Sequence, residues 1–277
     1  MSLKTGKLWV VATPLGNPGD LSPRAREVLS SVDGILAEDT RRSGLLLSRC
    51  GVEAAPFTSF HDHNEEERLP QVLGWLAAGK TLAIVSDAGT PLLSDPGYRL
   101  VRACREAGFA VSPVPGPSAP VAALSACGLP PLPYVFLGFL SRKAKDVEKT
   151  LAPYAGLPVT LAFFERKDRL HATLATALGV LGNREGVVAR EMTKTFEEFL
   201  PFTLERHTDI PEDLLGEITV ILGPPVARGK TAVAEVLAIV EKERLAGGKP
   251  KEVAKRVHQR LYGWTAKEVY EFMQTLA

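Results

Sequence analysis

The length, composition and charge of the chain limit what it can be. Its 277 residues suffice for about two domains of ordinary size. Apolar residues make up 45% of the sequence, so a large core can form without disulfides or metals. The 33 basic residues are balanced by 32 acidic residues, which argues against a cationic coat over the whole surface. Any contact with nucleic acid must therefore come from local patches.

The cysteines and the N-terminal sequence indicate a compartment. Cys50, Cys104 and Cys127 are scattered and have no CxxC spacing, which argues against a disulfide framework and against a zinc site. The apolar run 8–12 is too short for the core of a signal peptide or for a membrane span. We expect a cytoplasmic protein without membrane contact.

In the first 128 residues, short apolar runs alternate with helical stretches. Ser22 and Pro23 are typical of a helix N-cap followed by a first-turn proline. Strands that are apolar on both faces and separated by helices predict a parallel sheet covered on both sides. The predicted strands are 8–12, 34–37, 56–60, 81–85 and 110–114, and the predicted helices are 24–32, 40–51, 69–76, 98–107 and 118–127.

The proline-rich stretch 129–133 cannot continue a helix or a strand, so it predicts a linker. A second α/β domain, 134–225, is expected to carry a mixed sheet, with 200–213 irregular. Its predicted strands are 135–139, 159–164, 187–190 and 218–222, and its predicted helices are 142–152 and 168–178. The first domain is then 1–128.

The last region, 228–277, has ten basic residues against six acidic ones. Val253, Val257 and Leu261 mark one face of a helix. The basic side chains beside or opposite this face are Lys251, Lys255, Arg256 and Arg260.

Gly263 is expected to end that helix. Thr265 and Glu268 have the spacing of a capping box, which would open a last helix with Val269 and Phe272 facing inward. Two helices around a glycine turn predict a small helix-turn-helix-like appendage. A nucleic-acid contact and a solvated helical hairpin both remain open for it.

The segment 223–231 has the position of a Walker A loop, after a strand and before a helix. It has five residues between its glycines where the motif needs four, and Pro224 and Pro225 lack the N–H groups that such a loop aims at phosphate. GxGxxG is absent as well. The sequence thus argues against nucleotide hydrolysis and against a dinucleotide fingerprint.

Three loops rich in glycine, proline and small polar residues follow predicted strands: 13–20, 86–97 and 113–119. Ligands of an open parallel sheet bind at the carboxyl ends of its strands. Proline fixes the backbone there and glycine permits close approach. Because none of the loops carries Lys or Arg in its core, a neutral or zwitterionic ligand fits better than a phosphate. Tight turns without function are the alternative.

Several motifs stand in a fixed order along the chain. They are residues 11–17, the Glu-Asp-Thr-Arg-Arg of 38–42, the His-Asp-His-Asn of 61–64, 86–97, 114–118, 189–194 and 216–218. The series resembles the 16S ribosomal RNA 2′-O-methyltransferase family of the tetrapyrrole-methylase (class III) methyltransferases, over nearly the whole chain.

This resemblance implies two α/β domains, a parallel-sheet N-terminal domain and a mixed-sheet second domain, with S-adenosylmethionine in the cleft between them, and a homodimer. It also implies methylation of the ribose 2′-hydroxyl of a decoding-centre cytidine in 16S ribosomal RNA of the small subunit. The cofactor-binding residues that it implies are Leu15, Gly16, Gly89, Thr90, Leu93, Ser118, Ala119, Phe164 and Ala189.

Methyl transfer from a sulfonium mainly requires positioning and removal of a proton from the acceptor hydroxyl. The candidate helpers are Glu38, Asp39, His61, His63, Glu191 and Lys194. Glu38 and Asp39 could equally favour the start of a helix. The His-Asp-His tract lacks a third spaced ligand and the reaction needs no metal, so we expect no metal. The sequence singles out no one base.

The candidate RNA contacts are Arg41, Arg42, Arg142, Lys143 and Lys145. The run 142–145 opens the second domain, and a solvated helix end is its alternative. One departure from the family stands out: its usual Glu-Ser-Pro-His-Arg is Glu-Arg-Lys-Asp-Arg here, at 165–169.

Two other functions remain possible. One is a methyltransferase of the same fold acting on a small tetrapyrrole, which would not require the motifs at 38–42 and 61–64 or the basic tail. The other is a non-enzymatic RNA-binding factor with a vestigial cleft, against which the intact glycines and prolines of the three loops argue.

Overall fold

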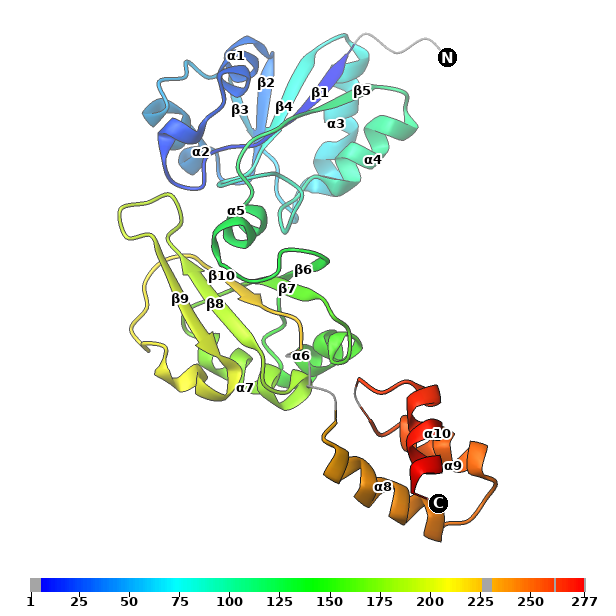
Figure 1. The fold of residues 1–277 in the computed structure, drawn as a ribbon. Helices are drawn as coiled ribbons and strands as arrows, with labels where there is room; N and C mark the ends of the chain where they lie inside the picture. The colour runs from blue at the N-terminus through cyan, green and yellow to red at the C-terminus, as the bar shows by residue number, and fades with distance from the viewer. Residues whose placement is uncertain (1–5, 226–230, 262, 277) are drawn as a thin grey trace. The chain divides into compact units, whose positions relative to one another are not determined.

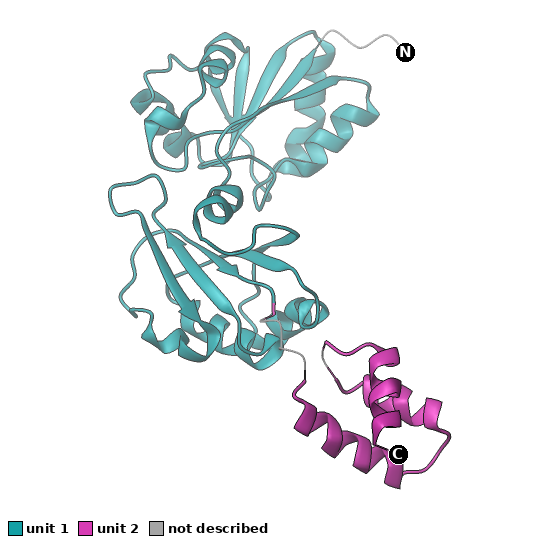
Figure 2. Cartoon of the chain, in the orientation of Figure 1, with its two compact units in different colours: residues 1–224 teal, residues 225–277 magenta. Residues whose placement is uncertain are grey.

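The computed structural model describes residues 6–225, 231–261 and 263–276. The chain forms two compact units, Met1–Pro224 and Pro225–Ala277 (Figures 1 and 2). Residues 226–230 lie outside the described residues, so most of the segment compared with a Walker A loop, and Arg228 at the start of the basic region, do as well. The predicted division of the first unit into domains 1–128 and 134–225 stays a prediction.

The first sheet of unit 1 is parallel throughout, as predicted. Its strand order is β3-β2-β4-β1-β5. Its strands are β1 (Lys7–Val11), β2 (Gly34–Ala37), β3 (Phe57–Ser59), β4 (Thr81–Val85) and β5 (Ala110–Val114). The connecting helices are α1 (Pro23–Ser31), α2 (Thr40–Arg49), α3 (Glu65–Ala77) and α4 (Tyr98–Glu106), with a short 3-10 turn at Pro18–Asp20.

Helices cover both faces of this sheet. One apolar cluster joins the sheet to Leu29 of α1 and Leu47 of α2, and another joins it to Leu76 of α3 and Leu100 of α4, all fully buried. Ser22 accepts a hydrogen bond from the backbone of Ala25 at 3.1 Å, which is the N-cap that its position before Pro23 predicted. The loops that follow the strands lie at the carboxyl edge of the sheet.

The second sheet is mixed, in the order β6-β7-β10-β8-β9, with only β6 and β7 parallel. Its strands are β6 (Tyr134–Phe139), β7 (Thr160–Glu165), β8 (Glu185–Arg190), β9 (Glu198–Thr203) and β10 (Ile218–Leu222). Its helices are α5 (Ala119–Ala126), α6 (Ala144–Leu151) and α7 (Leu170–Leu181), with 3-10 turns at Ala152–Tyr154 and Leu204–Asp209.

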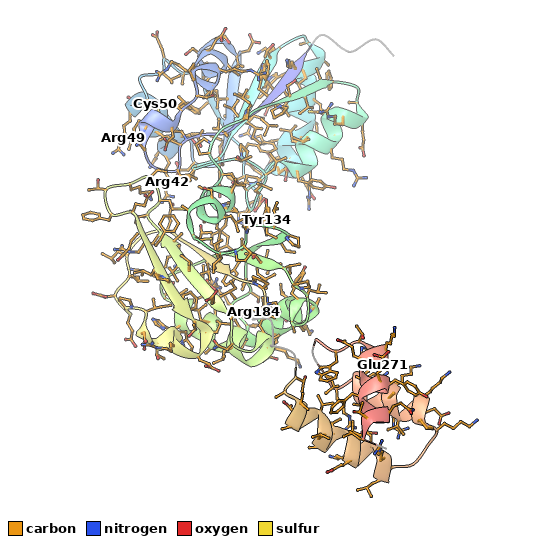
Figure 3. All side chains as sticks on the ribbon, in the orientation of Figure 1. Arg42, Arg49, Cys50, Tyr134, Arg184 and Glu271 are labelled. Atoms are coloured by element: carbon orange, nitrogen blue, oxygen red, sulfur yellow. The ribbon has the colours of Figure 1, made fainter. Side chains whose placement is uncertain are left out.

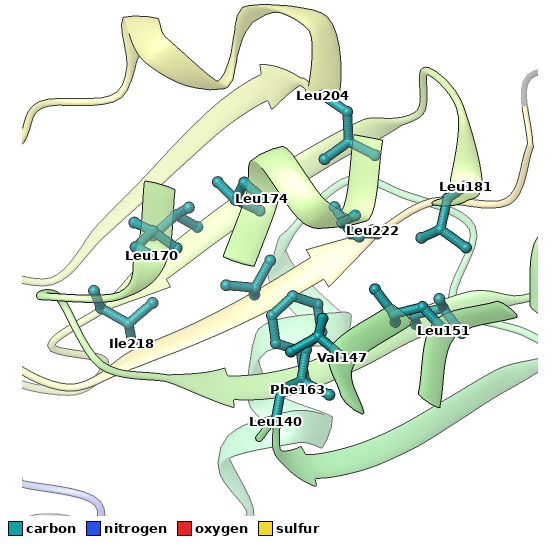
Figure 4. Packing of buried hydrophobic residues seen from close by; sticks show 14 of the residues in the cluster. Leu140, Val147, Leu151, Phe163, Leu170, Leu174, Leu181, Leu204, Ile218 and Leu222 are labelled. Carbon is teal, nitrogen blue, oxygen red and sulfur yellow. The ribbon is translucent and has the colours of Figure 1, made fainter. Parts of the chain in front are cut away.

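Two apolar clusters hold this sheet. Phe163 of β7 and Leu222 of β10 pack with Leu174 of α7 on one face (Figure 4). On the other face, Ala123 and Leu124 of α5 pack against strand residues of the mixed sheet. Helix α5 follows β5, the last strand of the parallel sheet in the chain, and packs against the mixed sheet, so it connects the two sheets.

The prediction that 200–213 is irregular is wrong for its first residues, which belong to strand β9. Pro201 is an unfavourable residue for a strand, because proline cannot donate to a β-ladder. Strand β9 is an edge strand that pairs with β8 on one side, and Pro201 lies opposite Val187. An edge strand tolerates proline where the missing N–H would face away from the partner strand.

Unit 2 has three helices in the part that the structure describes: α8 (Val233–Leu245), α9 (Pro250–His258) and α10 (Ala266–Thr275). Val253, Val257 and Val269 are buried in its core, and Phe272 packs against them, as expected. The predicted capping box is confirmed: Thr265 Oγ1 accepts from the backbone N–H of Glu268 at 3.1 Å, and the Glu268 carboxylate accepts from that of Thr265 at 2.6 Å.

Two of the four basic side chains named beside the predicted helix face, Arg256 and Arg260, are paired within unit 2. Glu243, whose side chain is 6% exposed, binds Arg256 at 2.8 Å and Arg260 at 3.0 Å. Lys251 and Lys255 are exposed. Part of the excess positive charge therefore serves the fold of the unit. Across the described residues, no helix is long and apolar enough to cross a bilayer.

Arg184, just before β8, is fully buried without a carboxylate partner (Figure 3). Its guanidinium donates to the backbone carbonyls of Tyr154 at 2.7 Å and Ala155 at 3.0 Å, and to those of Val159 and Gly223 at 3.4 and 3.2 Å. Burial lowers the pKa of Arg184. One side chain thus fixes the turn after α6, the start of β7 and the end of β10.

We predict that Arg184→Ala lowers the free energy of unfolding by about 3–4 kcal/mol, because it leaves a buried void and carbonyl groups without a donor. Urea unfolding followed by far-ultraviolet circular dichroism measures the change. The control is Arg49→Ala, an exposed arginine at the end of α2, which should change stability by less than about 0.5 kcal/mol. Equal stability of the two variants would contradict the role of Arg184.

Candidate active site

A cavity of about 450 Å³ lies where the carboxyl edge of the parallel sheet meets the mixed sheet. The parallel sheet contributes the loops around 15, 87–95 and 118–120. The mixed sheet contributes the ends of β6 and β7, the segment 165–168, Met192 and the segment 216–219. Its volume is in the range of small-molecule and cofactor sites.

The three glycine- and proline-rich loops are tied together by hydrogen bonds. Thr13 and Gly89 exchange two of them, at 2.9 and 3.1 Å, and the Thr13 hydroxyl donates to the Ser86 carbonyl at 3.2 Å. Thr90 Oγ1 donates to the carbonyl of Pro117 at 2.9 Å. The loops after β1, β4 and β5 therefore form one surface, as their places at the sheet edge predicted.

The loop 86–97 has an unusual backbone. Leu92 and Ser94 have φ angles of 72° and 77°, in the left-handed region that residues other than glycine rarely adopt. Gly97 has a φ of 117°. A Cβ on Gly138, in the irregular end of β6, would lie 2.9 Å from Ser94 Oγ. Packing against the mixed sheet thus holds this loop in a strained form, as is common at functional sites.

Most of the residues that the resemblance implied for the cofactor lie on this cavity. Two of the nine do not line it: Ala189 is fully buried in β8, and Gly16 is exposed beside Lys194. Those that line it are Leu15, Gly89, Thr90, Leu93, Ser118, Ala119 and Phe164.

Gly16 marks a contact between the two sheets. Any Cβ at this position would collide with the Lys194 side chain. Lys194 Nζ binds Glu191 at 2.9 Å and Glu217 at 3.0 Å, and the backbone N–H of Asn17 donates to Thr193 Oγ1 at 3.2 Å. The loop after β1 and the loop after β8 are therefore joined at the rim of the cavity.

These contacts change the chemistry of two catalytic candidates. Burial raises the pKa of Glu191, but hydrogen bonds from Lys194 and from the Glu217 backbone outweigh it and lower the pKa. Burial lowers the pKa of Lys194, but its bonds to Glu191 and Glu217 raise it on balance. A carboxylate and an ammonium locked to each other in this way are poor proton acceptors.

Asp39 and His61 also have structural tasks. Asp39 caps α2 by accepting from the backbone N–H groups of Arg41 at 2.9 Å and Arg42 at 3.1 Å. These hydrogen bonds lower the pKa of Asp39, and the bond from the Arg42 backbone has the largest effect. The His61 backbone donates to Asn64 Oδ1 at 2.8 Å, and its ring lies edge-on to His63. The ring atom Nδ1 of His61 is buried without a partner.

A group of carboxylates gathers at the edge of the parallel sheet. Glu38 follows β2, Asp62 follows β3, and Asp87 and Asp95 follow β4. The pKa of Asp95 is raised to about 7. Burial is the largest cause, and the charges of Glu38, Asp87 and Asp62 add to it. Burial also raises the pKa of Asp87, although the charge of Arg42 acts in the opposite direction. The pKa of Glu38 is raised by burial first and then by the charges of Asp87 and Asp62.

Asp87 and Asp95 line the cavity, and the sequence analysis named neither as a candidate. Their position in a loop after a strand was a usable signal. The order of the strands was not known from the sequence, so their meeting with Glu38 and Asp62 could not be predicted. Further lining residues missed from the sequence are Ser94, Phe139, Met192, Gly216, Ile218 and Thr219.

The candidate RNA contacts are exposed. Arg42 pairs with Asp87 at 3.4 Å and Asp39 at 3.9 Å, and its side chain is 76% exposed (Figure 3). Arg142, Lys143 and Lys145 lie at the start of α6, directly after β6, whose last residue lines the cavity. The structure thus leaves all of these positions open to a large acceptor.

Comparison with known proteins decides the family. A model of the tetrapyrrole (corrin/porphyrin) methylases matches residues 7–207. The chain belongs to this family. It is 41% identical over 274 residues to the ribosomal RNA small subunit methyltransferase I of Haemophilus influenzae, covering 97% of this chain and 96% of that protein. It is 50% identical over 193 residues to the protein of that name from Escherichia coli O157:H7, covering 69% and 67%.

Solved structures of tetrapyrrole methylases share the fold. The methyltransferase CobJ aligns with a TM-score of 0.62 at 20% identity, covering 82% of this chain and 97% of that one. A uroporphyrin-III C-methyltransferase from Thermus thermophilus complexed with S-adenyl homocysteine aligns with a TM-score of 0.56 at 20% identity, covering 78% and 96%. These likenesses confirm the predicted α/β fold, and the family makes the chain a methyltransferase.

The departure from the family pattern at 165–169 lies on the cavity. The two positions that keep the family residue are structural: Glu165 is buried, forms an ion pair with Arg169 and accepts from Thr173 Oγ1 at 2.6 Å. The three changed positions, Arg166 to Asp168, are exposed and line the cavity. The fold therefore keeps the ends of the motif, and the changed residues alter only the cavity mouth.

The raised pKa of Asp95 makes stability depend on pH. A carboxyl group with a raised pKa in the folded state binds protons more tightly there than in the unfolded state, so it disfavours folding once it ionises. Between the ordinary aspartate pKa of 3.8 and the folded value of about 7 this penalty grows with pH, and above the folded value the penalty is complete.

Asp95→Asn should therefore raise the Tm at pH 8, and the gain should vanish by about pH 4. Differential scanning calorimetry over this pH range measures it. The control is Asp213→Asn, an exposed aspartate, whose effect on Tm should not vary with pH. A gain independent of pH, or a lower Tm at pH 8, would contradict the raised pKa.

Proposed function

We propose that this protein methylates the ribose 2′-hydroxyl of a decoding-centre cytidine of 16S ribosomal RNA, with S-adenosylmethionine as methyl donor. The observation that carries the proposal is the similarity, along 97% of the chain, to a protein named ribosomal RNA small subunit methyltransferase I. The sequence motifs, the family and the cavity all agree with it.

The cavity residues fit the chemistry of the cofactor. S-adenosylmethionine combines a flat apolar base, polar groups and a positive sulfonium. Leu15 and Phe164 offer apolar surface, and the carboxylates Asp87 and Asp95 offer negative charge. In our proposal the cofactor is held by Leu15, Gly89, Thr90, Leu93, Ser118, Ala119 and Phe164.

Gly16 and Ala189 have indirect parts in this proposal. Gly16 leaves room for the Lys194 side chain, so that the loops after β1 and β8 can meet at the rim. Ala189 pairs with Thr219, which lines the cavity, and its small side chain lets α5 pack against β8.

The bound cofactor supplies a methyl carbon that its sulfonium makes electrophilic. The protein has to place the acceptor oxygen in line with that carbon, exclude water and accept the hydroxyl proton. The two sheets enclose the reacting groups, since the cavity has walls from both. The contact of Lys194 with Gly16 and the bond of Asn17 to Thr193 keep these walls together.

The RNA is proposed to cross the cavity mouth. Arg166 and Lys167 lie there, beside the cofactor residue Phe164. Exposed arginine and lysine suit the phosphate backbone, which dominates the affinity of RNA-binding surfaces. The contacts proposed further along the surface are Arg41, Arg42, Arg142, Lys143 and Lys145.

The assembled form is proposed to be a homodimer in the cytoplasm, where small ribosomal subunits are made. Strand β6 is a free edge of the mixed sheet, and Leu132 beside it is 76% exposed. Free edges and exposed apolar side chains favour contact with another chain. A second copy of this protein is the partner that the family resemblance implies.

The test is transfer of a radiolabelled methyl group to small ribosomal subunits that lack the modification. Nuclease protection should map the label to one decoding-centre cytidine, and alkaline hydrolysis should leave one resistant dinucleotide, because 2′-O-methylation removes the nucleophile of alkaline cleavage. Free 16S RNA and large subunits serve as comparison substrates.

The outcomes separate the alternatives. Label on a base would retain a ribosomal RNA methyltransferase and refute transfer to the ribose. Cofactor binding without label on subunits or free RNA would refute the RNA substrate and favour a small tetrapyrrole. Absence of cofactor binding would instead indicate an RNA-binding factor.

A further inference from the structure

We infer that Asp95 is the group that accepts the proton of the acceptor hydroxyl during methyl transfer. This inference rests on the proposed function and names the catalytic residue that the sequence left open. Asp95 lines the cavity beside the proposed cofactor residues Leu93 and Thr90.

The position of Asp95 is set by the backbone. It stands between Ser94, with its left-handed φ of 77°, and the buried Pro96 and Gly97. A Cβ on Gly97 would lie 2.6 Å from Ile84 Cδ1, so only glycine allows the loop to return this closely to β4. The strained segment thus fixes the backbone of Asp95 at the cavity wall.

Asp95 is free to accept a proton. Among the described residues it has no ion pair and no hydrogen bond from another side chain. The groups that face it from β2, β3 and β4 are the carboxylates of Glu38, Asp62 and Asp87. Arg42, the nearby cation of α2, is paired with Asp87 at 3.4 Å and with Asp39 at 3.9 Å.

Most charged side chains on the opposite wall of the cavity, from the mixed sheet, are also held in ion pairs. Glu165 is paired with Arg169, Arg166 with Asp168 at 3.3 Å, and Glu217 with Lys194 at 3.0 Å. Lys167 is exposed at the mouth. No described cation is therefore placed to keep Asp95 permanently ionised.

The other carboxylates are less suited to the task. Asp39 is occupied by the N-terminus of α2, and Glu191 by Lys194 and the Glu217 backbone. Glu38 does not line the cavity. Asp87 lines it but is bound to Arg42. Asp95 alone among these combines a place on the cavity wall with an unpaired carboxylate.

The Asp95 carboxylate takes the proton of the ribose 2′-hydroxyl while an oxygen lone pair forms the new bond to the methyl carbon. The bond between that carbon and sulfur breaks, and its electron pair stays on sulfur, which becomes a neutral thioether. Asp95 then releases the proton to water. A group with a pKa of about 7 is half unprotonated at neutral pH and still basic enough to draw the proton.

The experiment compares the wild-type protein with Asp95→Asn in single-turnover methyl transfer to small subunits, with cofactor and subunits saturating, from pH 5.5 to 9. Asp213→Asn is the control, since this aspartate is exposed and does not line the cavity. Calorimetric binding of S-adenosylhomocysteine is the readout that does not depend on activity.

The wild-type rate constant should rise with pH and level off above about pH 7, because Asp95 must be ionised to act. Asp95→Asn should lower the rate constant about 10²- to 10⁴-fold and flatten the profile, with the Kd of S-adenosylhomocysteine unchanged within about threefold. Asp62→Asn removes a charge that faces Asp95, so it should move the midpoint of the profile to lower pH.

Three results would overturn the inference. An Asp95→Asn rate within about threefold of wild type with the same pH profile would show that another group takes the proton. Recovery of the rate at higher cofactor concentration would show a binding role. Failure of the wild-type protein itself to label small subunits would refute the proposed function, and this inference with it.

Discussion

The pair of backbone hydrogen bonds between Thr13 and Gly89 is the constraint on which the site depends. Those bonds tie the loop after β1 to the loop after β4, two neighbouring strands at the centre of the parallel sheet. Thr90 then ties the second loop to the loop after β5. Because the bonds between Thr13 and Gly89 run through the backbone and the third loop is tied by one hydroxyl, most side chains of the loops remain available for a ligand. The mixed sheet closes the cavity from the other side, through α5 and the contact at Gly16.

Charge is distributed unevenly around this cavity. The carboxylates Glu38, Asp62, Asp87 and Asp95 gather on the parallel sheet. The mixed sheet contributes both signs to the cavity, and its acidic residues Glu165, Asp168 and Glu217 are each paired with a cation. The overall balance of 33 basic and 32 acidic residues hides this local group of carboxylates. The carboxylates of the first surface suit the cationic sulfonium of the proposed cofactor.

Much of the architecture was predictable from local patterns. The apolar runs at 34–37 and 81–85 predicted buried parallel strands because they are apolar on both faces, and the capping box at Thr265 was evident from spacing alone. Strand β9 is hard to predict because a proline such as Pro201 disfavours a strand unless the strand lies at the edge of a sheet. The carboxylate group was missed for a related reason. It depends on β2 lying between β3 and β4, and strand order is set by long-range packing that no local pattern contains.

We propose that the cavity between the two sheets holds the cofactor. A crystal structure of the protein with S-adenosylhomocysteine, at a concentration that calorimetry shows to be saturating, is the most direct test. Ligand density is expected between Leu15, Ser118 and Phe164, with the sulfur on the side of Asp95. Density at another place, with this cavity closed or filled by side chains, would contradict it.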